Sequence, residues 1–383
     1  MQTSPLSTAA VLQALAIFAV GFLFRPLGGA LIGAYSDRRG RSAALRLSLM
    51  LMAGGSLLIA IAPPYQEVGV LAPVLLVLAR AVQGLSAGGE ITVMSTYVNG
   101  ISPKGRRGLY SSAIYISTTL GTLAATLLSL ILHTALPAAD LSSWGWRVPF
   151  AFGALLGVYG WYLRGRVDET DVFSAASSRL RNPAWQVLRD HPGATARVVG
   201  FTVGTTVVYY TFASYLPLYA QHVFKVPANA ALWASMGAQV VFVVALPLLG
   251  MLSDRFGRRP LLLAFGAGFT CLTPLFFSLI TGSALWLFVV MTAALLLFGC
   301  CAAAAPSAML EMFPTRLRSS GIGLPYSLTV ALFGGTAPYL IEYLSAHGHG
   351  HWYPWYVVAL CLISTVTFFL YRETKDVELA EVG

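Results

Sequence analysis

The sequence Gly33-Ala-Tyr-Ser-Asp37-Arg38-Arg39-Gly40-Arg41 returns in the second part of the chain as Gly250-Met-Leu-Ser-Asp254-Arg255-Phe256-Gly257-Arg258-Arg259. A weaker pair joins Ser102-Pro103-Lys104-Gly105-Arg106-Arg107-Gly108 with Phe313-Pro314-Thr315-Arg316-Leu317-Arg318-Ser319. Self-similarity of this kind indicates two structural repeats within one chain. We therefore expect a protein built from two related halves, each of which carries one Asp-Arg loop.

The composition excludes an ordinary soluble globule. Of the 383 residues, 57% are hydrophobic and only 10% are charged, whereas a soluble domain carries about 25% charged residues. Apolar stretches of about 19 to 29 residues, each long enough to cross a bilayer as a helix, alternate with charged clusters. They lack the alternation of barrel strands, so we predict an all-α integral membrane protein. The eleven predicted spans are residues 8–34, 43–62, 70–98, 109–132, 146–164, 195–220, 229–250, 260–280, 283–305, 321–345 and 352–371.

The formal charge of +9 reports membrane topology rather than a nucleic-acid partner. Most Lys and Arg residues lie in short loops that alternate with loops carrying only Arg147 and Lys225. By the positive-inside rule, the basic loops are cytoplasmic, both Asp-Arg loops included. The C-terminus is then expected inside and residues 1–7 outside. The four cysteines lie in apolar stretches without disulfide or metal-ligand spacing, so we expect core residues and no metal site.

The position of the Asp-Arg loops indicates an offset between the halves. Two predicted spans precede the loop in the second half, but only one precedes it in the first. We therefore expect a twelve-helix plan that lacks its first helix, with five spans followed by six. The predicted units are an N-terminal bundle over residues 1–165, a cytoplasmic central loop over 166–194 and a C-terminal bundle over 195–383.

Several local motifs carry a resemblance to a known family. They are Gly21-Phe-Leu-Phe-Arg25-Pro26-Leu-Gly-Gly29, Arg80-Ala-Val-Gln83-Gly84 with Gly88-Gly89-Glu90, Trp146-Arg147-Val-Pro149-Phe150, Glu311-Met-Phe-Pro-Thr-Arg316-Leu-Arg318 and Phe333-Gly334-Gly335-Thr-Ala-Pro338. With the Asp-Arg loops, they resemble the major facilitator superfamily and, within it, the metabolite:proton symporters, which include permeases for citrate, alpha-ketoglutarate, shikimate and proline or betaine. The resemblance covers the whole chain and implies two helical bundles that work by alternating access.

The Asp-Arg loops are candidates for a conformational gate. Asp37 and Asp254 fall at cytoplasmic helix junctions, where a carboxylate can cap a neighbouring helix N-terminus and pair with arginine. Such contacts break when the halves rock apart, so the loops are expected to bias the conformational equilibrium. For the arginines, contact with lipid headgroups is the alternative. The candidate gate residues are Asp37, Arg38, Arg41, Asp254, Arg255 and Arg258.

Three charged residues lie well inside predicted spans, and all belong to the first half. A charge near the bilayer centre costs about 2.5 to 3.5 kcal/mol, so each is a functional candidate. Arg25 and Glu90 fall at nearly the same depth and could form an ion pair, which alone would serve helix packing. Arg80 has no carboxylate at its level, so we expect it to bind an anion, with Gln83 on roughly the same helix face. The resemblance also places Arg80 in a pattern linked to proton transfer.

The polar candidates of the second half are hydroxyl side chains. Tyr209, Tyr210 and Thr211 lie on the counterpart of the missing helix. First helices of three-helix units line the cavity in the resembled superfamily, so these three are candidates to orient a substrate; a packing role is the alternative. Glu342, near the outer end of its span, is interpreted as interfacial, and the Gly-spaced histidines over residues 347–351 as a solvated loop.

These observations predict a secondary transporter that takes up a small metabolite bearing a carboxylate. The coupling to protons is implied by the resemblance alone. The acidic first-helix segment of the resembled family is missing here, which leaves Glu90 as the carboxylate at membrane depth. A proline or betaine type zwitterion carrier is the alternative, with aromatic rings facing the amine. An alternative of another class is a truncated membrane protein that does not transport.

Catalysis has no support in the sequence, which contains no Walker loop, dinucleotide-binding glycine pattern or Ser/His/Asp arrangement. We therefore expect no enzyme activity and no cofactor. The expected partners are a small-molecule substrate, a proton and the lipid bilayer. The resemblance implies a multi-pass protein of the cytoplasmic membrane, and we expect a monomer.

Overall fold

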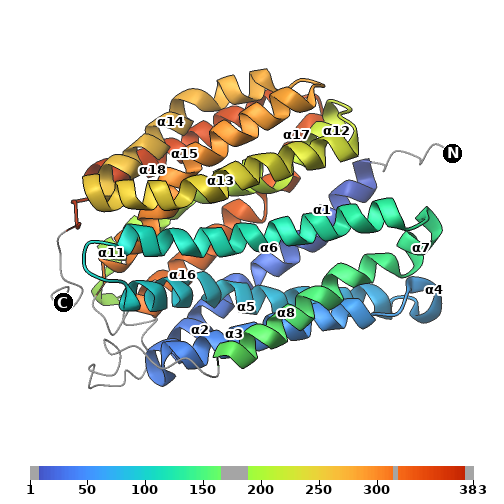
Figure 1. Cartoon of the computed structure of the whole chain (residues 1–383), viewed down its shortest axis with the longest axis horizontal. Helices are drawn as coiled ribbons and strands as arrows, with labels where there is room; N and C mark the ends of the chain where they lie inside the picture. Colours follow the sequence, from blue (N-terminus) through green and yellow to red (C-terminus); the bar gives the residue numbers. More distant parts are fainter. Residues whose placement is uncertain (1–7, 165–188, 314–317, 376–383) are drawn as a thin grey trace.

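The computed structural model of the chain describes residues 8–164, 189–313 and 318–375, and every regular element within them is helical (Figure 1). The first half contains α1 (Thr8–Leu23), α2 (Arg25–Arg39), α3 (Arg41–Ile61), α4 (Tyr65–Val68), α5 (Leu71–Ile101), α6 (Arg107–Ala135), α7 (Ala138–Ser143), η1 (Gly145–Arg147) and α8 (Val148–Arg164). The second half contains α11 (Pro192–Val208), η2 (Tyr209–Tyr215), α12 (Leu216–Val223), α13 (Ala228–Phe256), α14 (Arg258–Leu279), α15 (Ala284–Leu310), α16 (Arg318–Thr329), η4 (Val330–Gly334), α17 (Ala337–Ala346), η5 (Gly350–Trp352) and α18 (Tyr353–Leu370).

Eight helical segments among the described residues are long and apolar enough to cross a membrane. They coincide with eight of the predicted spans. The other three predicted spans, over residues 146–164, 195–220 and 321–345, coincide with α8 and with two interrupted helices. The prediction of an all-α architecture is confirmed, while the count of eleven crossings and their orientation stay predictions. Most of the predicted central loop lies outside the described residues.

Two helical paths of the second half are interrupted by π-helical turns. The path from α11 to α12 contains η2, and the path from α16 to α17 contains η4. A π turn inserts an extra residue into a helix and often marks a functional site. The helical period in the sequence gives no sign of either turn, because one inserted residue leaves an apolar stretch equally apolar.

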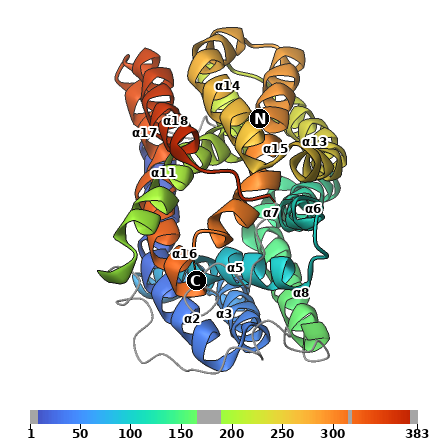
Figure 2. The same ribbon diagram turned by 90° about the vertical axis from the view of Figure 1, so that its left-hand side faces the viewer.

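The long helices run along the long axis of the molecule, and the start of α1 and the end of α18 lie toward opposite ends of that axis (Figure 1). In the view along this axis, α2, α3, α5 and α8 gather on one side and α13, α14, α15 and α18 on the other (Figure 2). The halves meet along two seams, where α2 packs against α16 and α6 packs against α13.

Glycines allow the backbones to touch at both seams. A Cβ atom on Gly29 of α2 would lie 2.4 Å from the carbonyl oxygen of Gly323 on α16. A Cβ atom on Gly108 of α6 would lie 2.6 Å from the carbonyl oxygen of Gly250 on α13. Small residues are the usual means of bringing membrane helices this close. Any larger side chain at Gly29 or Gly108 would separate the halves.

Candidate transport cavity and gate

A cavity of about 770 Å³ lies between α1, α2, α3, α5 and α6. Its polar lining consists of Arg25 on α2, Arg80 and Gln83 on α5, and Thr118 and Thr122 on α6. Glycine and apolar side chains form the rest of the wall. A mostly apolar pocket of this size with a few convergent polar groups is typical of small-molecule sites. Three residues predicted from the sequence therefore meet at one cavity.

Arg80 is held in the cavity wall by its neighbour on α5. Its Nη1 donates to Oε1 of Gln83 at 3.1 Å, and Nε2 of Gln83 donates to the hydroxyl of Ser56 on α3 at 3.1 Å. The Nε atom of Arg80 is buried and bonds to no group in the described part of the chain. The ion pairs of the described residues do not include Arg80 either. A guanidinium at a cavity wall that is not paired with a carboxylate can bind an anion.

A second cavity of about 480 Å³ lies between the two halves. Arg25 and Glu90 line it from the first half, and Tyr209 and Tyr210 line it from η2. It shares Arg25 with the first cavity, together with Phe18, Ala87, Thr118 and Gly121. The two cavities are thus adjacent, and Arg25 stands on their common wall.

Arg25 bonds to the opposite half rather than to Glu90. Its Nη1 donates to the hydroxyl of Tyr210 at 2.9 Å, and its guanidinium lies 4.1 Å from the ring centroid of Phe22. No ion pair to Glu90 occurs among the described residues; the charges of Arg25 and Arg164 act on Glu90 only through space. The predicted Arg25–Glu90 pair is therefore not formed in this conformation, although both side chains line one cavity.

Thr211 points away from the cavity. Its hydroxyl lies 2.6 Å from the hydroxyl of Tyr353 on α18, and both residues are buried. Of the three hydroxyl candidates, the structure therefore brings only Tyr209 and Tyr210 to the cavity. Ser214, Tyr115 and Tyr326 line it as well and were not proposed from the sequence as substrate contacts. Polar residues inside apolar spans are the only signal that could have found them.

The gate aspartates cap helices across the seams. Asp37 Oδ2 accepts hydrogen bonds from the backbone N–H and the hydroxyl of Ser320 on α16, at 2.9 and 2.7 Å. Asp254 accepts from the N–H groups of Gly108 and Leu109 on α6, at 2.7 and 2.9 Å, one on each oxygen. Each carboxylate thus binds the N-terminal turn of a helix in the other half, where the helix dipole favours negative charge.

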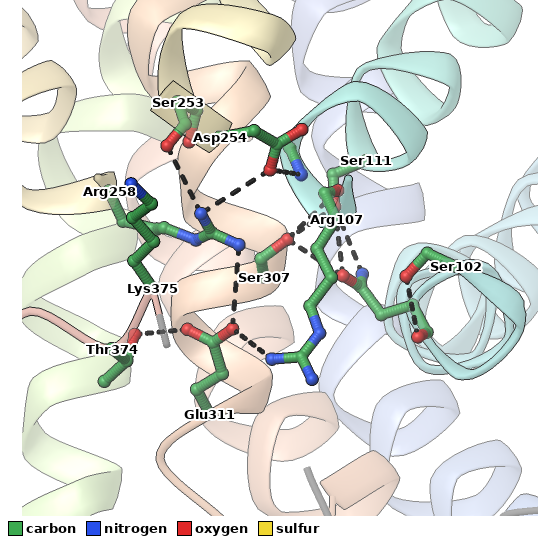
Figure 3. Close-up of polar contacts among 12 residues, drawn as sticks. Ser102, Arg107, Ser111, Ser253, Asp254, Arg258, Ser307, Glu311, Thr374 and Lys375 are labelled. Atoms are coloured by element: carbon green, nitrogen blue, oxygen red, sulfur yellow. Dashed lines mark hydrogen bonds and ion pairs between the residues drawn. The ribbon is translucent and has the colours of Figure 1, made fainter. Parts of the chain in front are cut away.

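A buried ion cluster adjoins Asp254 (Figure 3). Arg107 on α6 lies 3.0 Å from Glu311, the residue that follows α15. Arg258 lies 3.5 Å from Asp254 and 4.0 Å from Glu311, so it joins the two carboxylates. The hydroxyl of Thr374 also donates to Glu311. Burial raises the pKa of Glu311 despite these partners.

A hydroxyl and amide network lies beside the ion cluster. The hydroxyl of Ser307 on α15 lies 2.8 Å from that of Ser111 on α6 and also donates to Asn99 Oδ1 at 2.8 Å. These contacts join α5 and α6 to α15. Neither this network nor the Arg107–Glu311 pair is predictable from the sequence, because the residues that meet across the halves lie about 200 positions apart.

The remaining gate candidates occupy different environments. Arg41 is buried and donates to the carbonyl oxygen of Thr96 at 3.1 Å, inside the first half. Arg38 and Arg255 are exposed, and Arg255 stacks on the ring of Phe256 at 5.3 Å. Among the described residues no group of three or more His, Cys, Asp or Glu side chains is arranged to hold a metal ion.

The helical fold, the polar cavities and the bonded seams define a membrane transporter of two halves. The family model of the Major Facilitator Superfamily matches residues 4–241 and again 224–382, and the chain belongs to this superfamily. It is therefore a secondary transporter and a multi-pass membrane protein, and not an enzyme.

Similar proteins sharpen the assignment. The chain is 36% identical to the alpha-ketoglutarate permease of Escherichia coli (strain K12), over 97% of this chain and 87% of the permease. It is 33% identical to the citrate-proton symporter of Klebsiella pneumoniae, over 96% and 84%. The solved structure of the proton:xylose symporter XylE of E. coli covers 99% of this chain, with a TM-score of 0.78, 18% identity and 90% of its own chain matched. The expected major facilitator fold and the kinship with metabolite:proton symporters are confirmed.

Proposed function

We propose that the chain takes up a small carboxylate together with a proton by alternating access. The observation that carries this proposal is Arg80, whose side chain Gln83 fixes at the cavity wall while its Nε remains without a partner in the described structure. A carboxylate accepts two parallel bonds from a guanidinium, which gives both affinity and orientation. Two related proteins named for carboxylate transport support the same substrate class.

Arg25 and Tyr210 form the remaining part of the proposed substrate site. They connect the two halves through a single hydrogen bond at the wall shared by both cavities. A substrate held by Arg80 that also reached Arg25 would compete for this bond. Binding would then alter a contact between the halves, which is what a ligand must do to shift a conformational equilibrium.

The proposed gate is the set of contacts at the end of the molecule that carries the Asp-Arg loops, which we assign to the cytoplasmic side. Asp37, Asp254 and the Arg107–Glu311 pair all join one half to the other. We take the bundles over 1–165 and 195–383 as the moving units, with each chain acting as a single transporter. These contacts must break for the cavity to open inward.

Glu90 is the proposed coupling carboxylate in the cavity. It has no ion-pair partner among the described residues, and two arginine charges act on it from a distance. Binding a carboxylate at Arg80 and Arg25 would remove part of that positive field. Protonation of Glu90 would then accompany substrate binding, because two negative charges in one apolar cavity repel each other.

A zwitterionic substrate such as betaine is the second candidate. The cavity between the halves is lined by aromatic rings, among them Tyr115, Tyr209, Tyr210 and Tyr326. Ring faces attract ammonium groups, and Arg80 would bind the carboxylate of the same molecule.

Uptake by purified protein in liposomes tests the proposal. We expect accumulation of radiolabelled alpha-ketoglutarate when the outside is acid, with competition by other di- and tricarboxylates and little competition by betaine. The variant R80Q should lose at least about tenfold of this uptake, because it removes the charge that binds the anion. Efficient competition by betaine alone would favour the zwitterion, and full activity of R80Q would contradict the site.

A further inference from the structure

A carboxylate, an imidazole and a phenol meet near the end of the second half opposite the gate. Glu342 on α17 is only 5% exposed, although its sequence position was interpreted as interfacial. The hydroxyl of Tyr215, the last residue of η2, donates to Glu342 Oε2 at 2.5 Å. Nδ1 of His222 on α12 lies 3.5 Å from Glu342 Oε1. We call Tyr215, His222 and Glu342 the outer cluster; none of them lines either cavity described above.

The outer cluster has an unbalanced charge unless it holds a proton. His222 is the only basic group that pairs with Glu342 among the described residues. The phenols of Tyr219 and Tyr353 also act on the cluster, and the exposed Lys225 and His351 belong to segments that adjoin α12 and α17. The neighbouring helices α1, α15 and α18 contain no Asp, Glu, Lys, Arg or His, and α13 carries its charged residues, Asp254 and Arg255, at the gate end. An unneutralised carboxylate in apolar surroundings is costly, so one proton on Glu342 or His222 stabilises the cluster.

The cluster also has access to the exterior. The side chain of His222 is 22% exposed, whereas that of Glu342 is 7% exposed. Imidazole is the side chain that ordinarily changes charge between pH 5 and 8, so it can pass a proton between the medium and a buried acid. We propose that Tyr215, His222 and Glu342 form a one-proton binding site loaded from the outer side. Its role in transport rests on the proposed function above.

The two π turns connect the outer cluster to the substrate cavity. Tyr215 ends the π turn η2, whose first residues Tyr209 and Tyr210 line the cavity. Glu342 lies on α17, which follows the π turn η4. The two turns touch, since a Cβ on Gly334 of η4 would lie 2.6 Å from the ring of Tyr210. A change in how α12 binds α17 therefore acts on both turns beside the Tyr210–Arg25 bond.

Nuclear magnetic resonance of histidine tests the site without any substrate. The protein is labelled with ¹³C at histidine Cε1, titrated in detergent micelles, and the His222 signal is assigned by its loss in H222Q. We expect the pH dependence of the His222 signal to move to lower pH in E342Q, because the carboxylate that attracts an imidazolium is removed. The matched control E67Q, which changes an exposed carboxylate on α4, should leave the midpoint unchanged.

A second variant, Y215F, tests the site independently in case E342Q does not fold. The variant Y215F removes the hydrogen bond that stabilises the ionised carboxylate of Glu342. The shared proton then lies on Glu342 rather than on His222, so the His222 midpoint should fall in Y215F as well. A His222 midpoint that neither variant moves by more than about 0.2 unit would overturn the proton site.

Uptake measurements test the role of the site in transport separately. In proteoliposomes, external acid should stimulate alpha-ketoglutarate uptake by wild-type protein and by the exposed-loop control H347Q. H222Q and E342Q should lose at least about tenfold of this stimulation while retaining exchange at equal pH on both sides. An unchanged pH profile in both variants would overturn the transport role. Absence of any wild-type uptake would instead count against the proposed function, and the resonance titration would still decide the site.

Discussion

Replacing Asp254 with Asn should open the cytoplasmic end of the transporter. Each carboxylate oxygen accepts one backbone hydrogen bond from the start of α6, at 2.7 and 2.9 Å. Asparagine offers one acceptor oxygen, so one bond is lost and the other is no longer assisted by charge. Hydrogen bonds to charged groups contribute about 1.5 to 3 kcal/mol, so we expect the closed form to lose about 2 to 3 kcal/mol.

This loss corresponds to a shift of roughly 30- to 150-fold in the ratio of open to closed molecules. A wild-type population with about 1% open at the cytoplasmic end would become about 20 to 60% open. D37N should have a smaller effect, because both bonds from Ser320 go to a single oxygen of Asp37, which the Asn side chain retains.

Electron spin distances between the halves measure the shift. Spin labels at Ile101 and Phe256, which are 51% and 58% exposed, lie at the ends of α5 and α13 nearest the gate. The exposed Cys271 is replaced by Ala so that it takes no label. D254N should add a longer distance that wild type and E67Q lack. A distance distribution for D254N that matches wild type would refute the capping argument.

Three further predictions concern the gate and the cavity. Burial raises the pKa of Glu311, so the Glu311 carboxyl group holds a proton more tightly in the closed form than in the open form. As pH rises from the ordinary pKa of 4.5 through the raised pKa, the closed form should therefore lose stability. The spin distances should then show more opening, with no such trend in E311Q. G29A should lower the melting temperature and favour the open form by about 1 to 3 kcal/mol. The control G54A, where a Cβ atom meets nothing within 4 Å, should change neither. Equal melting temperatures of G29A and wild type would contradict the close contact of α2 with α16. Y210F should raise the KM for uptake about tenfold, because Tyr210 lines the cavity and accepts the hydrogen bond from Arg25. T211V should lower the melting temperature with little change in KM, because Thr211 bonds inside the second half.

The sequence predicted the features that repeat. The Asp-Arg loop occurs once in each half, and both aspartates cap a helix of the other half. The position of Arg80 at a cavity was also predictable, since a buried arginine without a carboxylate at its level needs an anion or a water-filled space. Both features follow from position along a helix and from the cost of burying charge.

The sequence could not predict contacts that depend on rotation about the helix axis. Arg25 and Glu90 are predicted at the same depth, and both line one cavity. Depth does not determine the direction of a side chain, and Arg25 bonds to Tyr210. The π turn η2 changes the direction of the side chains after Tyr209 about the helix axis, and Thr211 lies in the core of the second half. Glu342 lies within a turn of its helix end, where burial depends on how neighbouring helices cover it.

The flow of protons that accompanies substrate tests the central claim most directly. Proteoliposomes containing a trapped pH-sensitive dye are mixed with alpha-ketoglutarate in the absence of any initial pH difference. We expect acidification of the interior when the substrate enters, and about tenfold less acidification with R80Q, because substrate and proton enter together and Arg80 binds the substrate. Substrate entry without acidification, or equal acidification with R80Q, would contradict this claim.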